Sequence, residues 1–100
     1  MVKVRAVFKA PHRKPVPMLI TPNHVGVCSL VGGLYEHIDL SGDLVAVVNI
    51  NAMDRRSQKN VRIMGKQLYG PVVIVRMNKG LYESLSDEDT ENILRMIKTT

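Results

Sequence analysis

The stretch that most constrains the fold is residues 21–40, TPNHVGVCSLVGGLYEHIDL, because it predicts a helix joined directly to a strand. Thr21 is a favourable helix N-cap, and Asn23 is an alternative cap. Gly26 inside so short a helix costs about 1 kcal/mol relative to alanine, so packing must stabilise the helix. Gly32-Gly33 ends the helix, since a glycine in the left-handed region satisfies the last carbonyls without Cβ strain. The alternating residues that follow predict a strand.

Five segments are predicted as strands, from period-2 alternation or from runs of β-branched residues. They are residues 2–9, 16–20, 34–40, 44–50 and 71–77. Pro17 cannot donate a ladder hydrogen bond, so we expect its strand at a sheet edge. Residues 44–50, LVAVVNI, form the most continuous apolar run and predict a central strand covered on both faces. We expect this strand to pair with the one that precedes it across a tight turn.

Two further helices are predicted in the C-terminal half. After a polar loop, Ser57 or Asn60 caps a helix that Gly70 ends. That helix would place three apolar side chains on one face: Val61, Met64 and Leu68. The last helix begins after Ser86, which forms a capping box with Asp89. Its apolar stripe consists of Ile93, Leu94 and Ile97.

The predicted order of elements is strand, strand, helix, strand, strand, helix, strand, helix. This order indicates a single small α+β domain over residues 1–100, with a mixed sheet of four to five strands and two to three helices. The first four elements, with their short connections, are similar to the opening of a β-grasp domain. A β-grasp-like N-terminal half is therefore expected.

The composition is that of an ordinary globular protein, with 45% hydrophobic and 23% charged residues. The lone Cys28 cannot form an internal disulfide, which suits a reducing compartment. No apolar run approaches the roughly 20 residues that a transmembrane helix needs. The alternating N-terminus does not resemble a signal peptide. These features predict a cytoplasmic protein with no membrane contact.

Positive charge is concentrated in two parts of the chain, whose net charge is +5. Residues 1–14 contain five basic residues and no acid: Lys3, Arg5, Lys9, Arg13 and Lys14. Residues 54–66 contain five against Asp54 alone: Arg55, Arg56, Lys59, Arg62 and Lys66. If the basic residues of the first strand face outward beside the loop at His12, they form a positive ridge. Such clusters indicate an anionic partner, and the alternative is a solvated surface on a mildly basic protein.

A row of polar side chains, Tyr35, His37 and Asp39, occupies alternate positions of a predicted strand, about 7 Å apart on one face. The His beside the Asp could act as an oriented general base or supply two metal ligands, and the alternative is an exposed polar strand face. His24 and Cys28 are four residues apart on the predicted helix, but two ligands do not make a zinc site. The glycine pair follows a helix, whereas phosphate-cradling glycines precede one. We therefore predict no metal, no cofactor and no catalytic residue.

Four stretches of the chain follow one another in a distinctive order: LVGGLYEHIDL (30–40), DLVAVVNINA (43–52), KNVRIMGKQLYGPVVIVR (59–76) and YESLSDEDTENIL (82–94). In these motifs the chain resembles a family of short proteins of unknown function found in phages, plasmids and conjugative elements, which share a Leu-Val-Gly-Gly motif. Members often carry an acidic residue after the strand-ending Asn, where this chain has Ile50. The resemblance implies a mobile-element setting and an accessory role, and it supplies no catalytic or binding residues.

The leading hypothesis is a small non-enzymatic accessory protein of a phage or mobile element. It would bind a host protein or an anionic ligand in the host cytoplasm and interfere with a host defence. The alternative is a nucleic-acid-binding module that uses the two basic clusters. A third hypothesis is a small enzyme centred on His37 and Asp39, and a homo-oligomer is compatible with each. The predicted binding residues are Lys3, Arg5, Arg13, Lys14, Tyr35, His37, Arg55, Arg56, Lys59 and Arg62.

Overall fold

The fold centres on one long β-strand near the end of the chain. The structure, a computed structural model, describes residues 3–52 and 59–97. Its elements are β1 (Val4–Lys9), β2 (Val16–Ile20), α1 (His24–Val31), β3 (Tyr35–Ser41), β4 (Leu44–Asn49), β5 (Lys59–Ile63), β6 (Lys66–Tyr69), β7 (Val72–Asn78), β8 (Leu81–Glu83) and α2 (Asp87–Ile97). Strand β7 lies between β1 and β4 in a sheet of order β2-β1-β7-β4-β3, and β8 also pairs with β7. The result is an α+β domain in which a six-stranded sheet is joined by a separate β5–β6 hairpin.

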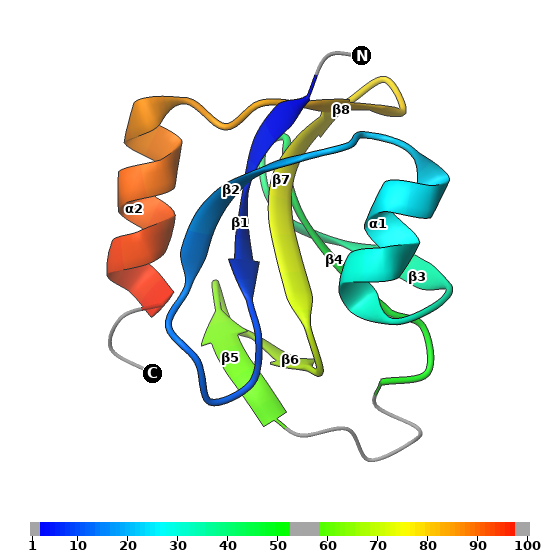
Figure 1. Ribbon diagram of the computed structural model, residues 1–100. Helices are drawn as coiled ribbons and strands as arrows, with labels where there is room; N and C mark the ends of the chain where they lie inside the picture. The colour runs from blue at the N-terminus through cyan, green and yellow to red at the C-terminus, as the bar shows by residue number, and fades with distance from the viewer. Residues whose placement is uncertain (1–2, 53–58, 98–100) are drawn as a thin grey trace.

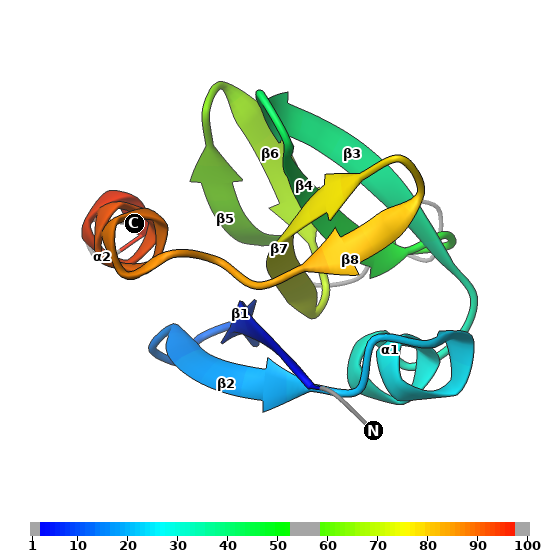
Figure 2. The ribbon, with the colours of Figure 1, turned by 90° about the horizontal axis from the view of Figure 1, so that it is seen from above.

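The sheet separates two hydrophobic cores, because β4 and β7 are buried on both faces. One core lies under the β5–β6 hairpin and α2, and it contains Ala46, Val48, Val61, Ile63, Leu68, Val72, Ile74, Ile93 and Ile97. The other lies under α1, and it contains Val27, Val31, Val45, Val47, Val73 and Val75. Figures 1 and 2 show α1 and α2 on opposite sides of the sheet. Alternate residues of the same strand therefore serve opposite cores, as the strand period of two requires.

Several predictions about the sheet are confirmed. Strand β2, which carries Pro17, lies at a sheet edge. Strand β4 is central, pairs with β3 on one side and β7 on the other, and is buried over Val45–Val48. The described residues form two helices, which is within the expected two to three. Along the chain that the structure describes, no helix has the length and apolar character needed to cross a bilayer.

The sheet differs from the prediction in strand number and direction. Six strands are present where four to five were expected, because the three-residue strand β8 escaped the sequence pattern. Every pairing between its strands is antiparallel, so the expectation of a mixed sheet is wrong. Short connections explain the pairs β1–β2, β3–β4 and β7–β8, since adjacent antiparallel strands need only a short loop. The pairings do not show the β-grasp-like arrangement that was expected for the N-terminal half.

The predicted helix beginning at Asn60 is wrong, because these residues form the β5–β6 hairpin. Val61 and Ile63 alternate toward the core, and Leu68 on the opposite strand joins them. Met64 and Gly65 form the turn with φ of 49° and 81°, the left-handed pair that a tight two-residue hairpin turn demands. The helix prediction placed Met64 on the apolar face of the helix. In the structure Met64 lies in the turn between β5 and β6.

Helix α1 starts later than its first predicted cap. Asn23, the alternative cap, accepts a hydrogen bond from the Gly26 N–H at 2.8 Å, and the helix begins at His24. Thr21 lies instead against Gly26, where an added Cβ would approach the Thr21 carbonyl oxygen to 2.4 Å. The predicted glycine stop is confirmed: Gly32 has φ of 83°, and its N–H donates to the Cys28 carbonyl.

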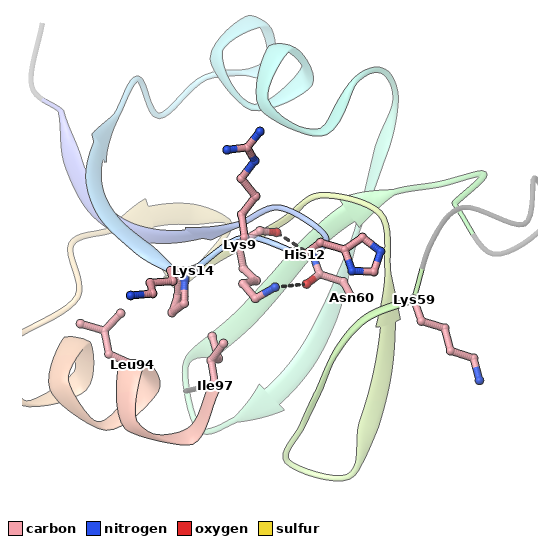
Figure 3. Close-up of a pocket in the computed structure, with 9 residues that line it drawn as sticks. Lys9, His12, Lys14, Lys59, Asn60, Leu94 and Ile97 are labelled. Carbon is pink, nitrogen blue, oxygen red and sulfur yellow. Dashed lines mark hydrogen bonds between the residues drawn. The ribbon is translucent and has the colours of Figure 1, made fainter. Parts of the chain in front are cut away.

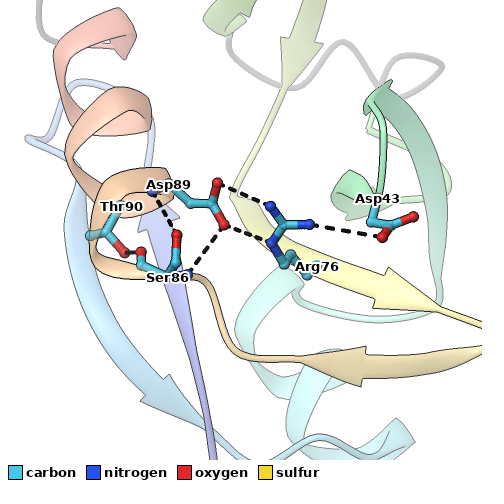
Figure 4. Close-up of polar contacts among 5 residues, drawn as sticks. All are labelled: Asp43, Arg76, Ser86, Asp89 and Thr90. Atoms are coloured by element: carbon cyan, nitrogen blue, oxygen red, sulfur yellow. Dashed lines mark hydrogen bonds and ion pairs between the residues drawn. The ribbon is translucent and has the colours of Figure 1, made fainter.

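The predicted capping box at α2 is confirmed and extends into an ion-pair network (Figure 4). The Asp89 N–H donates to Ser86 Oγ at 3.0 Å, and the Ser86 N–H donates to Asp89 Oδ2 at 3.2 Å. Arg76 on β7 donates to both Asp89 oxygens, at 2.6 and 3.1 Å, and also lies 3.8 Å from Asp43. The hydrogen bond from Arg76 lowers the pKa of Asp89 below its ordinary value of 3.8. The start of α2 is thereby fixed to the central strand.

Candidate functional site

A pocket of about 610 Å³ lies between the β1–β2 loop, the start of β5 and the end of α2. Three segments that are far apart in the sequence meet there, as Figure 3 shows. The pocket is lined by Lys9, His12, Arg13, Lys14, Pro15, Lys59, Asn60, Leu94 and Ile97. Its volume lies within the usual range for small-molecule sites.

Lys9 is the buried cation of this pocket, with only 7% of its surface exposed. Its ammonium donates to the Ala10 carbonyl and to Asn60 Oδ1, both at 2.9 Å. Neither acceptor is charged, and burial lowers the pKa of Lys9 below its ordinary value of 10.5. A lysine ammonium has three N–H donors, so these two bonds leave one donor for a ligand.

Asn60 holds the lysine in place through both ends of its amide. While Oδ1 accepts from Lys9, Nδ2 donates to the Lys9 carbonyl and to the Gly70 carbonyl, each at 2.7 Å. The β5 strand is thus tied to β1 across 51 residues of sequence. Because every polar atom of the amide is engaged, Asn60 positions Lys9 and has little capacity left for a ligand.

The rim of the pocket is basic and open to solvent. His12, Arg13 and Lys14 form the β1–β2 loop, and Lys59 begins β5 on the other side. The loop turns sharply, with a hydrogen bond from the Arg13 N–H to the Ala10 carbonyl and a left-handed φ of 61° at His12. No Asp or Glu occurs among the described lining residues, and the ion pairs found in residues 3–52 and 59–97 lie elsewhere. The positive charge here is therefore not neutralised by a neighbouring carboxylate within the described chain.

One wall of the pocket is aliphatic. Leu94 and Ile97 come from the last turns of α2, and Pro15 comes from the loop opposite. Together with the basic rim, this wall makes the pocket amphipathic. Such a lining suits a ligand that carries both negative charge and an apolar body.

The structure brings together some of the predicted binding residues and separates the rest. Arg13, Lys14 and Lys59, from the two basic clusters, meet in the pocket. Arg5 instead forms an ion pair with Asp87, and its N–H donates to Ser84 Oγ at 3.0 Å.

The other predicted residues lie away from the pocket or beyond the described chain. Lys3 and Arg62 are exposed and do not line the pocket. Arg55 and Arg56 lie outside the described residues. The predicted row Tyr35 and His37 belongs to a different cluster.

This cluster, here called the His–Tyr cluster, joins α1, β3 and β8. His37 Nε2 lies 2.7 Å from the Tyr82 hydroxyl, and the Tyr35 and His37 rings meet edge to face at 5.6 Å. His24 Nδ1 lies 3.2 Å from the Tyr35 hydroxyl, and its Nε2 lies 3.4 Å from Cys28 Sγ. Burial lowers the pKa of His37, with Asp39 opposing the shift, and burial raises the pKa of Tyr82. The described residues contain no group of three or more His, Cys, Asp or Glu placed to hold a metal ion.

The proposed pairing of His37 with Asp39 in a small enzyme gains no support from this geometry. The ring nitrogen of His37 meets Tyr82, and neither His37 nor Asp39 lines the 610 Å³ pocket. Tyr35 also packs at the edge of the core under α1. The contacts of this row connect secondary-structure elements.

Sequence reasoning missed the buried part of the pocket, above all Lys9 and Asn60. Lys9 was expected on an outward ridge, and its burial shows that expectation to be wrong. The sequence contained one indication that this face is buried: the apolar Val7 shares the face of β1 with Lys9, and it is fully buried. A strand that is covered on both faces has no outward ridge. Nothing in the local sequence linked Asn60 to β1.

Comparisons of the chain with protein-family models, with curated proteins and with solved structures found no match. The site is therefore interpreted from its own residues.

Proposed function

We propose that the protein is a small non-enzymatic binding protein that captures an anionic ligand in its basic pocket. One observation carries this proposal: three lysines, an arginine and a histidine from separate segments line one pocket without a carboxylate among the described lining residues. Like charges that converge repel one another, so an anion that enters gains from each of them. Charge-assisted hydrogen bonds to phosphate or carboxylate oxygens are also the stronger kind.

The buried position of Lys9 supports a binding role. A buried cation next to neutral acceptors loses hydration without gaining a partner charge, and such an arrangement contributes little to folding. An anion in the pocket would supply the missing charge. We therefore assign Lys9 the deepest contact and assign Arg13, Lys14 and Lys59 to the rim.

The biological setting is proposed from the motif resemblance alone. A mobile-element accessory protein that interferes with a host defence in the cytoplasm could act by removing an anionic ligand or by holding an acidic group of a host protein. The concave shape of the site favours the small ligand. Capture of such a ligand would give the accessory protein a mechanism of interference.

Nucleic-acid binding is the second candidate, favoured by one feature. Arg62 is exposed on β5, the strand that also contributes Lys59, so basic residues continue beyond the pocket. Single-strand binders usually combine such a groove with aromatic stacking platforms. No Phe, Tyr or Trp is among the described lining residues, and Tyr35 and Tyr82 belong to the His–Tyr cluster. The small-anion proposal is therefore preferred.

Calorimetric titration with inorganic tripolyphosphate at low salt tests the proposal. The double variant Arg13→Glu/Lys14→Glu should bind roughly a hundredfold or more weakly, since two charged hydrogen bonds are lost and each is worth about 1.5–3 kcal/mol. The matched control Lys3→Glu/Lys79→Glu changes the net charge equally at residues that do not line the pocket, and it should bind almost normally.

The same titration separates the two candidates. Equal losses in the two double variants, or no binding to tripolyphosphate, would contradict the small-anion proposal. A 12-nucleotide single strand that binds far more tightly than tripolyphosphate, with an affinity falling steeply with salt, would establish the nucleic-acid reading instead.

A further inference from the structure

We infer that the pocket takes a nucleoside polyphosphate, held with no selectivity for the base or for the 2′-hydroxyl. This inference rests on the proposed function and specifies its ligand. It follows from three properties of the lining: the number of cations, their separation from an aliphatic wall, and the engagement of the only side-chain amide among the described lining residues.

The number of cations indicates a ligand with several negative charges. Four basic side chains surround a single pocket: Lys9, Arg13, Lys14 and Lys59. A monocarboxylate or a phosphate monoester neutralises one or two of them, whereas a diphosphate or triphosphate chain can engage all four. The phosphates therefore lie between the β1–β2 loop and the start of β5, with Lys9 beneath them.

The aliphatic wall indicates an apolar body attached to that chain. Leu94 and Pro15 are half-buried and belong to the pocket lining, so part of their surface is available to a ligand. A pocket of about 610 Å³ has more room than a phosphate chain alone needs. A nucleoside fills this space with its base or sugar against the wall, while its phosphates remain at the basic rim.

The engaged polar groups explain the absence of selectivity. Discrimination between bases needs a polar side chain that is free to read a base edge. The Asn60 amide is already bonded at both ends, and Arg13 is assigned to the phosphates. Recognition of a ribose hydroxyl commonly uses a carboxylate, and the described lining residues include none. We therefore expect similar affinity for purine and pyrimidine nucleotides and for their deoxy forms.

Calorimetric titration of the full chain with a ligand series tests this inference. Affinity should rise at each step from AMP to ADP to ATP, adenosine alone should not bind detectably, and ATP should bind about fivefold more tightly than tripolyphosphate through apolar burial. GTP, UTP and dATP should lie within about threefold of ATP.

A substitution in the wall adds an independent test. Leu94→Ala should remove most of the advantage of ATP over tripolyphosphate and leave tripolyphosphate affinity unchanged. The control Leu81→Ala, an exposed residue of β8, should leave both affinities unchanged. Circular dichroism checks that each variant folds, and if Leu94→Ala does not fold, the comparison of ATP with tripolyphosphate on the unaltered chain decides the question.

The outcomes separate this inference from the proposed function. If tripolyphosphate and ATP bind equally, the anion pocket stands and the nucleoside assignment is wrong. Selectivity above tenfold for one base, or tighter binding of a dodecyl phosphate than of ATP, would also overturn it. If no anion in the series binds, both the pocket's function and its ligand are refuted.

Discussion

Replacement of Asn60 by alanine tests how the pocket is held together. The amide makes three hydrogen bonds, one with the charged Lys9 amine and two with backbone carbonyls. A bond to a charged group contributes about 1.5–3 kcal/mol and an amide-to-carbonyl bond about 0.5–1.5 kcal/mol. The three contributions sum to about 2.5–6 kcal/mol, but water can enter the open pocket and replace some of the lost hydrogen bonds. Asn60→Ala should therefore lower the free energy of unfolding by about 2–4 kcal/mol.

Urea denaturation followed by far-UV circular dichroism measures this loss, with an unchanged m-value as the sign that the unfolded state is unaffected. The matched control is Asn92→Ala, an asparagine exposed on α2, which should change the unfolding free energy by no more than about 0.5 kcal/mol. A double-mutant cycle with Lys9→Met isolates the bond between the two side chains, for which we expect a coupling of about 1.5–3 kcal/mol. A coupling near zero, or a loss below about 0.5 kcal/mol for Asn60→Ala, would refute the reasoning.

Three further predictions concern elements outside the pocket. Gly26→Ala should lower Tm by about 5 °C or more despite alanine's better helix propensity, because its Cβ would meet the Thr21 carbonyl; a higher Tm in thermal denaturation would contradict this. Burial lowers the pKa of His37 below 6.5, so the unfolded chain takes up this proton first and stability falls as the pH drops below 6.5. His37→Gln should make the urea-derived unfolding free energy less dependent on pH in that window, and an unchanged slope would count against the assigned shift. Because the pKa of Asp89 is lowered, its carboxylate stabilises the fold above pH 3.8, and this stabilisation is lost as the pH falls through the folded-state pKa. Asp89→Asn should therefore make the unfolding free energy less dependent on pH in that acid range in the same assay, and an unchanged pH dependence would contradict the assigned shift.

Features set by neighbouring residues could be predicted from the sequence. The capping box joins Ser86 and Asp89, three residues apart, and its hydrogen bonds need nothing from the rest of the chain. The glycine stop of α1 likewise depends only on the left-handed conformation of Gly32. The edge position of β2 followed from a single proline that cannot donate to a ladder.

The β5–β6 hairpin was mispredicted because two spacings compete in one stretch. Val61, Met64 and Leu68 satisfy a helical face, and Val61 and Ile63 satisfy a strand face. The choice is made by tertiary packing, in which Val61, Ile63 and Leu68 cover the sheet over Val72 and Ile74. The local feature that favours the hairpin is Gly65, because a tight turn needs the left-handed conformation that Met64 and Gly65 adopt.

The candidate site was only half predictable, for a related reason. The basic loop at Arg13 and the basic segment at Lys59 were visible as charge clusters, but their union depends on how the hairpin docks beside β1. The burial of Lys9 depends on the same docking. The β5–β6 hairpin and α2 cover a face of β1 that the β1–β2 hairpin alone would leave exposed to water. Long-range packing determines which basic residues share a pocket and which remain separate.

The distribution of charge along α2 explains how the pocket stays positive. Asp87, Glu88 and Asp89 lie in the first turn of this 11-residue helix, whereas Leu94 and Ile97 face the pocket from its last turns. At 1.5 Å per residue, about 10 Å of helix separates these three acids from the pocket wall, roughly one Debye length at 0.1 M salt. Glu91 lies nearer to Leu94 along the helix, but it is not among the described lining residues. Two of these acids are also engaged by arginines from the sheet, Arg5 with Asp87 and Arg76 with Asp89. The acids thus stabilise the start of the helix without cancelling the field at its end, and the pocket's cations remain available to a ligand.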